Sequence, residues 1–134
     1  MMAVDTSVII AISMNEPEAD AFRPLMGRET VIIGWPTLLE ARMVLTGKGF
    51  ISAATMIKRL SETPNVITVA FEEKHFRAAE DAFTRFGRGR HPAALNMGDC
   101  FSYAVAAVAK APLLFKGRDF SQTDLKLHPA SSTT

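Results

Sequence analysis

Four acidic residues occupy positions at which a chain of alternating strands and helices can bring them together. Asp5 closes the apolar run "MAV", Asp119 follows shortly after the apolar run "PLLF", and Asp99 stands directly before the apolar stretch "CFSYAVAAVA". Glu40 lies in the segment "PTLLEARMVL", where apolar residues three and four positions later would share its helix face. We therefore expect Glu40 to point inward or into a cleft.

A cluster of carboxylates indicates a particular chemistry. Two unit charges about 4 Å apart repel by roughly 4 kcal/mol at an effective dielectric constant of about 20, so the cluster needs protons or cations to neutralise it. Mg2+ prefers oxygen ligands and keeps several waters, and Mn2+ suits the same ligands. A metal in an open acidic site lowers the pKa of a bound water and stabilises a developing oxyanion, as phosphodiester hydrolysis requires. The acids therefore point to a nuclease or a phosphatase.

Other residues give weaker signals. His75, His91 and His128 are far apart in the sequence and lack ligand-like spacing, so core or solvent roles are the simpler interpretation. Cys100 has no candidate base near it in the sequence and is typical of a small buried thiol. The acids also have an ordinary interpretation, because Asp is a good helix N-cap and Glu40 could be a solvated helix residue. Their joint position at one sheet edge favours a shared site.

Basic residues stand on both sides of Asp99 in the sequence. The formal net charge is only +1, so any attraction to nucleic acid must come from a local patch. The loop "RFGRGRHP" contains glycines that would allow a close approach of the backbone. Loop arginines are most often simply solvated, and phosphate binding is the alternative. The candidate contacts to RNA phosphates are Arg85, Arg88, Arg90, Lys116 and Arg118.

The elements that must position these residues alternate along the chain. Apolar runs predict strands near residues 2–5, 30–35, 65–71, 112–117 and 125–129. Spacing and punctuation predict helices over 6–15, 16–27, 36–49, 50–63, 72–87 and from Asp99 onward, with Gly27 ending the second of them. The sequence therefore predicts an α/β fold with a mostly parallel central sheet of four to five strands and helices on both faces. Ligands of such sheets bind beyond the carboxyl ends of the strands, where the four acids fall.

Length and composition predict a single domain over residues 1–134, because the chain has 134 residues, 48% of them hydrophobic, and no repeat or low-complexity tract. The tail over 130–134, "ASSTT", is expected to fray. The single cysteine excludes an intramolecular disulfide. No apolar run approaches the roughly 18 residues that span a bilayer, and the first one carries Asp5 and lacks a basic leader. We expect a cytoplasmic protein without a membrane partner.

Longer motifs extend this interpretation. The segments "VDTSVIIAI", "PTLLEARMVL" and "LNMGDCFSYAVAAVAKAPLLFKGRDFSQTD", with the terminal strand, resemble a PIN domain and more narrowly the VapC toxins of bacterial VapBC toxin–antitoxin pairs. The resemblance covers nearly the whole chain, and the third motif is the most specific. It implies a metal-dependent endoribonuclease that cleaves structured RNA, commonly tRNA or ribosomal RNA, and that is silenced by a VapB antitoxin.

The resemblance also assigns roles to residues. The catalytic acids of the family fall on Asp5, Glu40, Asp99 and Asp119, and Asp5 and Asp99 are the expected ligands of Mg2+, for which Mn2+ would substitute. Asp5 or a metal-bound hydroxide would act as general base. The implied supporting residues are Thr6 or Ser7, Asn96 and Asp124, the last of which we interpret mainly as a residue that starts a turn or strand.

The resemblance implies protein partners as well. Family members usually form homodimers through helices on one side, and the apolar segment "FISAATMIKRL" is a candidate, although any helix that faces a core shows the same stripe. A larger toxin–antitoxin assembly is a further expectation. A basic side chain of the antitoxin would enter the acidic pocket, because it neutralises the charge without supporting catalysis.

Two other functions are weighed against the nuclease. A catalytically silent PIN-like binding module is disfavoured because all four acids are present. A receiver-like phosphotransfer domain would need a pair of acids early in the chain and a phosphoacceptor Asp after the third strand. "AVDTS" has one acid and "NVITVAFEEK" offers only glutamates, so the match is poor.

Overall fold

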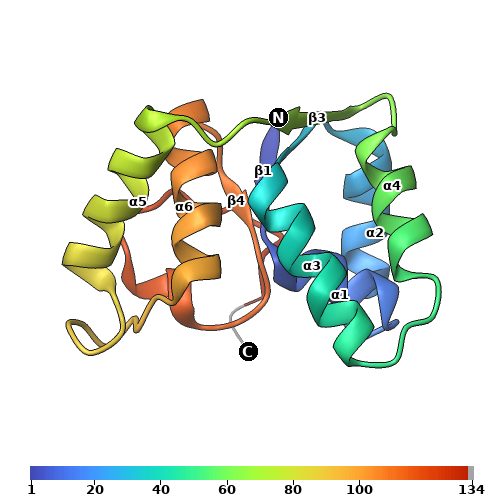
Figure 1. The fold of residues 1–134 in the computed structure, drawn as a ribbon, viewed down its shortest axis with the longest axis horizontal. Helices are drawn as coiled ribbons and strands as arrows, with labels where there is room; N and C mark the ends of the chain where they lie inside the picture. The colour runs from blue at the N-terminus through green and yellow to red at the C-terminus, as the bar shows by residue number, and fades with distance from the viewer. Residues whose placement is uncertain (133–134) are drawn as a thin grey trace.

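The computed structural model describes residues 1–132, and a parallel four-stranded sheet runs through their centre (Figure 1). The strand order is β3-β2-β1-β4, so the short first strand lies between two neighbours. This position explains why every residue of that strand is buried. The strands are β1 (Met2–Val4), β2 (Val31–Gly34), β3 (Val66–Val69) and β4 (Leu113–Leu114).

Helices cover both faces of this sheet, as the sequence predicts. Figure 1 shows α5 and α6 on one side of β1 and β4, with α1, α2 and α4 on the other. Leu38 of α3 packs in the same core cluster as the side chains of α1 and α2. The helices are α1 (Thr6–Ser13), α2 (Ala19–Arg28), α3 (Trp35–Gly47), α4 (Ala53–Ser61), α5 (Glu73–Phe86), α6 (Met97–Ala109) and a short 3-10 helix, η1 (Asp119–Gln122).

Side chains alternate across the sheet and build a core on each face. Ala3 belongs to the cluster that includes Val105 of α6, whereas its neighbours Met2 and Val4 belong to the cluster that includes Phe22 of α2. This alternation follows from the two-residue period of a strand. The burial of β1 on both faces places the residue after it, Asp5, at a fixed point at the carboxyl edge of the sheet.

The second helix runs further than the sequence indicates. Gly27 lies inside α2, which ends at Arg28 and also contains Pro24. Burial of Phe22 and Leu25 on the inner face outweighs the local cost of a proline and a glycine. The expectation that Gly27 ends this helix is therefore wrong, because the helix continues to Arg28.

The C-terminal segment pairs with β4 but forms no fifth strand within residues 1–132. Leu113 makes an isolated parallel bridge to Leu127, with its N–H donating to Lys126 O at 3.0 Å. Pro129 has no N–H and interrupts this pairing, which resumes at an isolated parallel bridge between Lys116 and Ser132. Ser132, in the tail that was expected to fray, donates from its backbone N–H to Phe115 O at 3.0 Å. Residues 133–134 of that tail lie outside the described residues.

Within residues 1–132, no helix is both long and apolar enough to cross a membrane. The apolar residues of the longer helices instead pack in the cores, as in α6, where Cys100, Tyr103, Val105 and Ala106 belong to the cluster that includes Ala3 of β1.

Candidate active site

The four acids come from four different elements. Asp5 follows β1 directly, Glu40 lies on α3, Asp99 lies in the first turn of α6, and Asp119 is the first residue of η1. Asp5 and Asp99 are buried, Glu40 is partly buried and Asp119 is exposed. The four acids at the carboxyl edge of the sheet therefore range from buried to exposed, and the cluster meets solvent at Asp119.

Asp5 is held through both of its carboxylate oxygens. As N-cap of α1 it accepts a hydrogen bond from the backbone N–H of Ser7 at 3.0 Å, and the Ser102 hydroxyl donates to its other oxygen at 2.5 Å. Ser102 is itself buried on α6. A carboxylate with two fixed donors keeps one orientation, so Asp5 presents its remaining lone pairs in a fixed direction.

Glu40 contacts two residues that are adjacent in sequence to other acids of the site. The hydroxyl of Thr6, the residue after Asp5, donates to Glu40 Oε1. The carboxylate also lies directly against Gly98, where a Cβ atom would overlap it. The glycine before Asp99 is therefore required by the close approach of Glu40, which brings α3 and the start of α6 together at the site.

Asp99 takes part in a capping box at the start of α6. The backbone N–H of Asp99 donates to the side chain of Asn96 at 2.9 Å, and the backbone N–H of Asn96 donates to the Asp99 carboxylate at 3.1 Å. The N-cap is Asn96, so the ordinary interpretation of Asp99 as the cap residue is wrong. Asp99 nevertheless contributes one oxygen to the capping box and keeps its other oxygen for the cluster.

Burial raises the pKa of Asp99 to about 8. The negative charge of Asp5 acts in the same direction, as do the charge of Asp119 and a side-chain hydrogen bond to Asp119. The backbone N–H of Asn96 opposes this shift because it favours the ionised form. The shift shows that three of the acids share one electrostatic environment. Such an environment is relieved by a proton or by a bound cation.

The donor set fits a hard divalent cation. Carboxylate oxygens are the ligands that Mg2+ and Mn2+ prefer, and Mg2+ is commonly held by one or two carboxylates with waters completing the octahedron. Over residues 1–132, no group of three or more His, Cys, Asp or Glu side chains is arranged to hold a metal ion. A pair of protein ligands, Asp5 and Asp99, agrees with both observations.

The hydroxyl groups near the acids have distinct partners. Thr6 binds Glu40, whereas the Ser7 hydroxyl accepts from the backbone N–H of Lys116 at 2.9 Å and so connects α1 to the segment after β4. Ser102 is a supporting residue that sequence reasoning missed. Its signal was its position three residues after Asp99, which places both on one face of α6.

Two of the candidate phosphate-binding residues already have partners within the protein. Arg85 forms ion pairs with Asp81 and Asp124 and donates to the Tyr103 hydroxyl, and Lys116 forms ion pairs with Glu16 at 2.8 Å and Glu18 at 3.0 Å. The remaining candidates, Arg88, Arg90 and Arg118, lie on exposed loops. The guanidinium of Arg90 lies over the Phe83 ring, 5.0 Å from its centroid.

The histidines and the cysteine take structural roles. His75 is buried and completes the capping box of α5, and His128 contacts Glu29 at 2.9 Å. Cys100 is a buried free thiol, as the sequence predicts, and burial raises its pKa to about 11. A thiol with a raised pKa is a poor nucleophile.

Comparison with known proteins identifies the family. The PIN domain model matches residues 2–126. "VapC ribonuclease Mb2004c" of Mycobacterium bovis and "Ribonuclease VapC36" of Mycobacterium tuberculosis are each 40% identical over 127 residues, which cover 93% of this chain and 91% of each relative. The chain therefore belongs to the PIN domain family, and within that family to the VapC ribonucleases.

Solved structures show the same fold at lower identity. Mycobacterium tuberculosis VapC20, described as a Sarcin-Ricin loop cleaving toxin, aligns with a TM-score of 0.77 at 17% identity and covers 93% of this chain and 96% of its own. A chain of a toxin–antitoxin complex from Klebsiella pneumoniae aligns with a TM-score of 0.67 at 15% identity, covering 99% of this chain and 97% of its own. The predicted PIN fold is thus confirmed, and the receiver-like alternative is excluded.

Proposed function

We propose that this protein is a metal-dependent endoribonuclease that acts as the toxin of a toxin–antitoxin pair and hydrolyses RNA phosphodiester bonds. The observation that carries the proposal is the meeting of Asp5, Glu40, Asp99 and Asp119 at one sheet edge, with the pKa of Asp99 raised by burial and by two of the other acids. The ribonuclease names of relatives at 40% identity support it.

Asp5 and Asp99 would hold Mg2+ or Mn2+, and Glu40 and Asp119 would contribute directly or through water. A bound ion would lower the pKa of a water and neutralise the charge that develops on the scissile phosphate. The protein contributes orientation: Ser102 and the Ser7 N–H fix Asp5. Asp5 would also accept a proton from the attacking water if no hydroxide is available.

The substrate would be structured RNA, with tRNA and ribosomal RNA as the proposed classes. VapC20 shares the fold and is described as cleaving the Sarcin-Ricin loop, which supports a ribosomal target without naming one for this chain. Arg88, Arg90 and Arg118 are the best placed of the basic candidates to contact phosphates, because Arg85 and Lys116 already bind acidic side chains. Contacts of this kind position the backbone and carry no sequence information.

An antitoxin of the VapB type would silence the enzyme. The fold is shared with a chain of a toxin–antitoxin complex, which supports such a partner. The raised pKa of Asp99 means that this cluster favours a positive charge. A basic side chain would bind there, because its charge takes the place of the proton or the metal. We propose that the antitoxin places such a residue among the four acids.

The test is cleavage of total bacterial RNA by the purified protein freed of any partner. The wild type, Asp99→Asn and Arg77→Gln are compared with Mg2+, with Mn2+ and with a chelator; Arg77 is an exposed control whose recorded ion pair is to Glu73. Cuts at discrete positions that require metal, persist in the control and disappear in Asp99→Asn are expected. Cleavage that survives Asp99→Asn, or no cleavage by a folded wild type, would contradict the proposal.

A further inference from the structure

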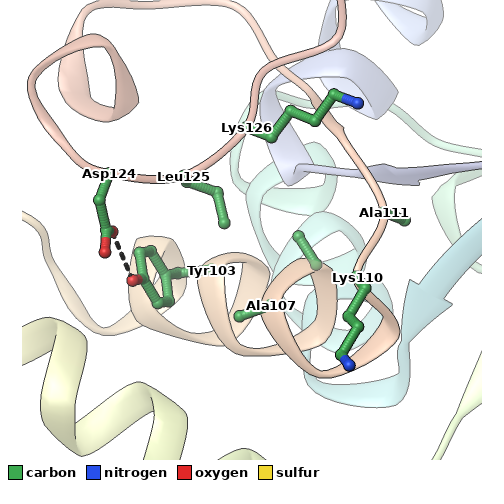
Figure 2. A pocket seen from close by; sticks show the side chains of 8 residues that line it. Tyr103, Ala107, Lys110, Ala111, Asp124, Leu125 and Lys126 are labelled. Atoms are coloured by element: carbon green, nitrogen blue, oxygen red, sulfur yellow. Dashed lines mark hydrogen bonds between the residues drawn. The ribbon is translucent and has the colours of Figure 1, made fainter.

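The segment that carries Asp119 has only partial support from apolar packing. Phe120 is buried and its ring meets the Phe115 ring edge-on at 5.2 Å. Beyond it, however, a hollow of about 350 Å³ opens between α6 and the chain at Asp124 and Leu125 (Figure 2). The segment therefore borders this hollow at Asp124 and Leu125, between the buried Phe120 and the point where Leu125 packs against the core.

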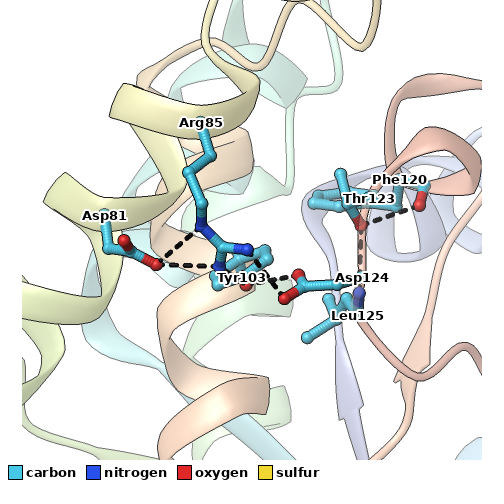
Figure 3. Close-up of polar contacts among 7 residues, drawn as sticks. All are labelled: Asp81, Arg85, Tyr103, Phe120, Thr123, Asp124 and Leu125. Atoms are coloured by element: carbon cyan, nitrogen blue, oxygen red, sulfur yellow. Dashed lines mark hydrogen bonds and ion pairs between the residues drawn. The ribbon is translucent and has the colours of Figure 1, made fainter.

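Three polar side chains connect α5 and α6 to the C-terminal segment at the edge of this hollow. The Tyr103 hydroxyl donates to Asp124 Oδ1 at 2.6 Å, Arg85 Nη1 donates to Asp124 Oδ2 at 2.9 Å, and Arg85 Nη2 donates to the Tyr103 oxygen at 2.9 Å (Figure 3). Asp81 holds the other side of the guanidinium at 2.8 Å. We refer to Arg85, Tyr103 and Asp124 as the C-terminal clamp.

The clamp joins three elements that are distant in the sequence. Arg85 lies in the last turn of α5 and Tyr103 lies one turn after Asp99 on α6, whereas Asp124 follows η1. The short turn between Asp119 and Asp124 is stiffened by the Thr123 hydroxyl, which donates to Phe120 O at 2.9 Å. Asp124 therefore stands at the end of a hydrogen-bonded turn that begins next to Asp119.

The clamp restrains the chain mainly through the geometry of its hydrogen bonds and less through attraction between charges. The side chains of Arg85 and Asp124 are 41% and 52% exposed, so water screens much of their attraction. The Tyr103 ring is buried, and its hydroxyl needs a partner at the protein surface. The hydrogen bond from Tyr103 and the ion pair with Arg85 hold the pKa of Asp124 below its ordinary value, so the carboxylate stays ionised at neutral pH.

We propose that Arg85, Tyr103 and Asp124 are positioning residues that hold Asp119 beside Asp99. This inference rests on the proposed function, because it assumes that Asp119 takes part in catalysis. It gives a specific role to Asp124, which is interpreted from the sequence mainly as a residue that starts a turn or strand, and it gives Arg85 an intramolecular role in place of a contact to RNA. Loss of the clamp displaces an acid of the site without removing it.

The experiment compares Asp124→Asn and Tyr103→Phe with Arg77→Gln, an α5 control whose ion pair to Glu73 does not touch the C-terminal segment. Amide hydrogen exchange is measured first, because it needs no activity. Both clamp variants are expected to exchange faster over residues 116–125 while α5 and α6 stay protected. Unchanged exchange in that segment in both variants would overturn the proposal.

Steady-state cleavage of an RNA substrate is then measured well below each variant's melting temperature. A displaced acid lowers kcat, by about tenfold to a hundredfold for Asp124→Asn, and leaves KM within about twofold. An unchanged kcat, or a loss confined to KM as expected for a phosphate contact, would overturn the proposal. Tyr103→Phe gives the same readout if Asp124→Asn does not fold. An inactive wild type would instead refute the proposed function, while the exchange data would still report on the clamp.

Discussion

Asp5 shows how single residues of this protein combine folding with chemistry. The same carboxylate caps α1 and accepts a buried hydrogen bond from Ser102. The two interpretations that the sequence offers for such an acid, helix cap and site residue, are therefore compatible. A carboxylate that is fixed before any ligand arrives loses little entropy when one binds.

Removal of the Ser102 hydroxyl tests this orientation. Ser102→Ala is expected to lower kcat by about tenfold to a hundredfold, which is typical for loss of a residue that orients a metal ligand, the role proposed for Asp5. It should also reduce the free energy of unfolding by about 1–3 kcal/mol, because Asp5 keeps its burial and loses a donor. Activity and urea denaturation check both effects. Ser13→Ala, which removes a hydroxyl bound to Ile9 O in α1, serves as the control and should retain activity.

The titration of Asp99 predicts how stability depends on pH in the metal-free protein. Its pKa is about 8 in the folded state and ordinarily 3.8, so between these values the folded state holds a proton that the unfolded chain has released. The contribution of Asp99 to the free energy of unfolding is therefore largest at low pH, falls as the pH rises from about 4 to about 8, and is lost above that.

Urea denaturation of metal-free wild type and Asp99→Asn at several pH values measures this effect. The difference in free energy of unfolding between the variant and the wild type should shift in favour of the variant as the pH rises toward 8. Parallel pH profiles for the two proteins would show that Asp99 titrates near its ordinary value. Chelator is present throughout, because a bound cation would replace the proton.

At the scale of elements, the first turn of α6 does most to assemble the site. Asn96 caps the helix, Gly98 admits the Glu40 carboxylate, and Asp99 and Ser102 reach Asp119 and Asp5. One helix start thus contacts the three other elements that carry acids. A change of backbone position here is expected to disturb all four carboxylates together.

Gly98→Ala tests this close approach. A Cβ at this position would overlap the Glu40 carboxylate and push it away from Thr6, so we expect a large loss of kcat. Gly27→Ala is the matched control, because it lies within α2 with no atom within 4 Å of its added Cβ. The control should keep full activity and gain up to about 1 kcal/mol of stability from helix propensity. Equal activity of the two variants would contradict the assignment of Glu40 to the site.

The elements were largely predictable because their signals are local. Apolar runs and the prolines and glycines that begin or end helices indicate the alternating strands and helices, and the parallel order places Asp5 and Asp119 at one edge. The hydrogen bond between Asp5 and Ser102 joins residues 97 positions apart, and the spacing of Ser102 from Asp99 does not by itself reveal this contact. The C-terminal clamp could not be predicted from the sequence either, because its three members come from segments that are distant in the sequence. The expected fifth strand is reduced to isolated bridges, from Leu113 to Leu127 and from Lys116 to Ser132, because Pro129 between them has no N–H to donate.

At the scale of the whole molecule, exposed apolar side chains gather over α3, α5 and the start of α6. Met97 stands 73% exposed between two apolar hollows, one toward α5 and one toward α3, that both include Phe101. A two-fold interface brings the same patch of both copies together, and aromatic residues with methionine are typical of interface cores. We propose that a homodimer forms through this surface, whose exposed members are Trp35, Leu39, Met43, Phe76, Phe83 and Met97.

The segment "FISAATMIKRL" is a weaker candidate for that dimer. Met56, Ile57 and Leu60 of α4 pack against the core, so their apolar stripe is already used. Met43→Glu is therefore expected to give a monomer of about 14.6 kDa, and the isolated exposed Ile51→Glu should remain dimeric. Light scattering coupled to gel filtration measures both masses. A monomeric wild type at tens of micromolar, or a monomeric Ile51→Glu, would count against this surface.

The strand order has a consequence for the protein during its own synthesis. β1 lies between β2 and β4, so the strand made first receives its second neighbour only when residues 113–114 have been added. Asp119 joins the other acids later still, after more than a hundred residues have left the peptidyl transferase centre. A nascent chain therefore lacks the complete set of acids while most of it is being translated. Assembly of all four acids at the sheet edge is therefore a late event in the folding of the nascent chain.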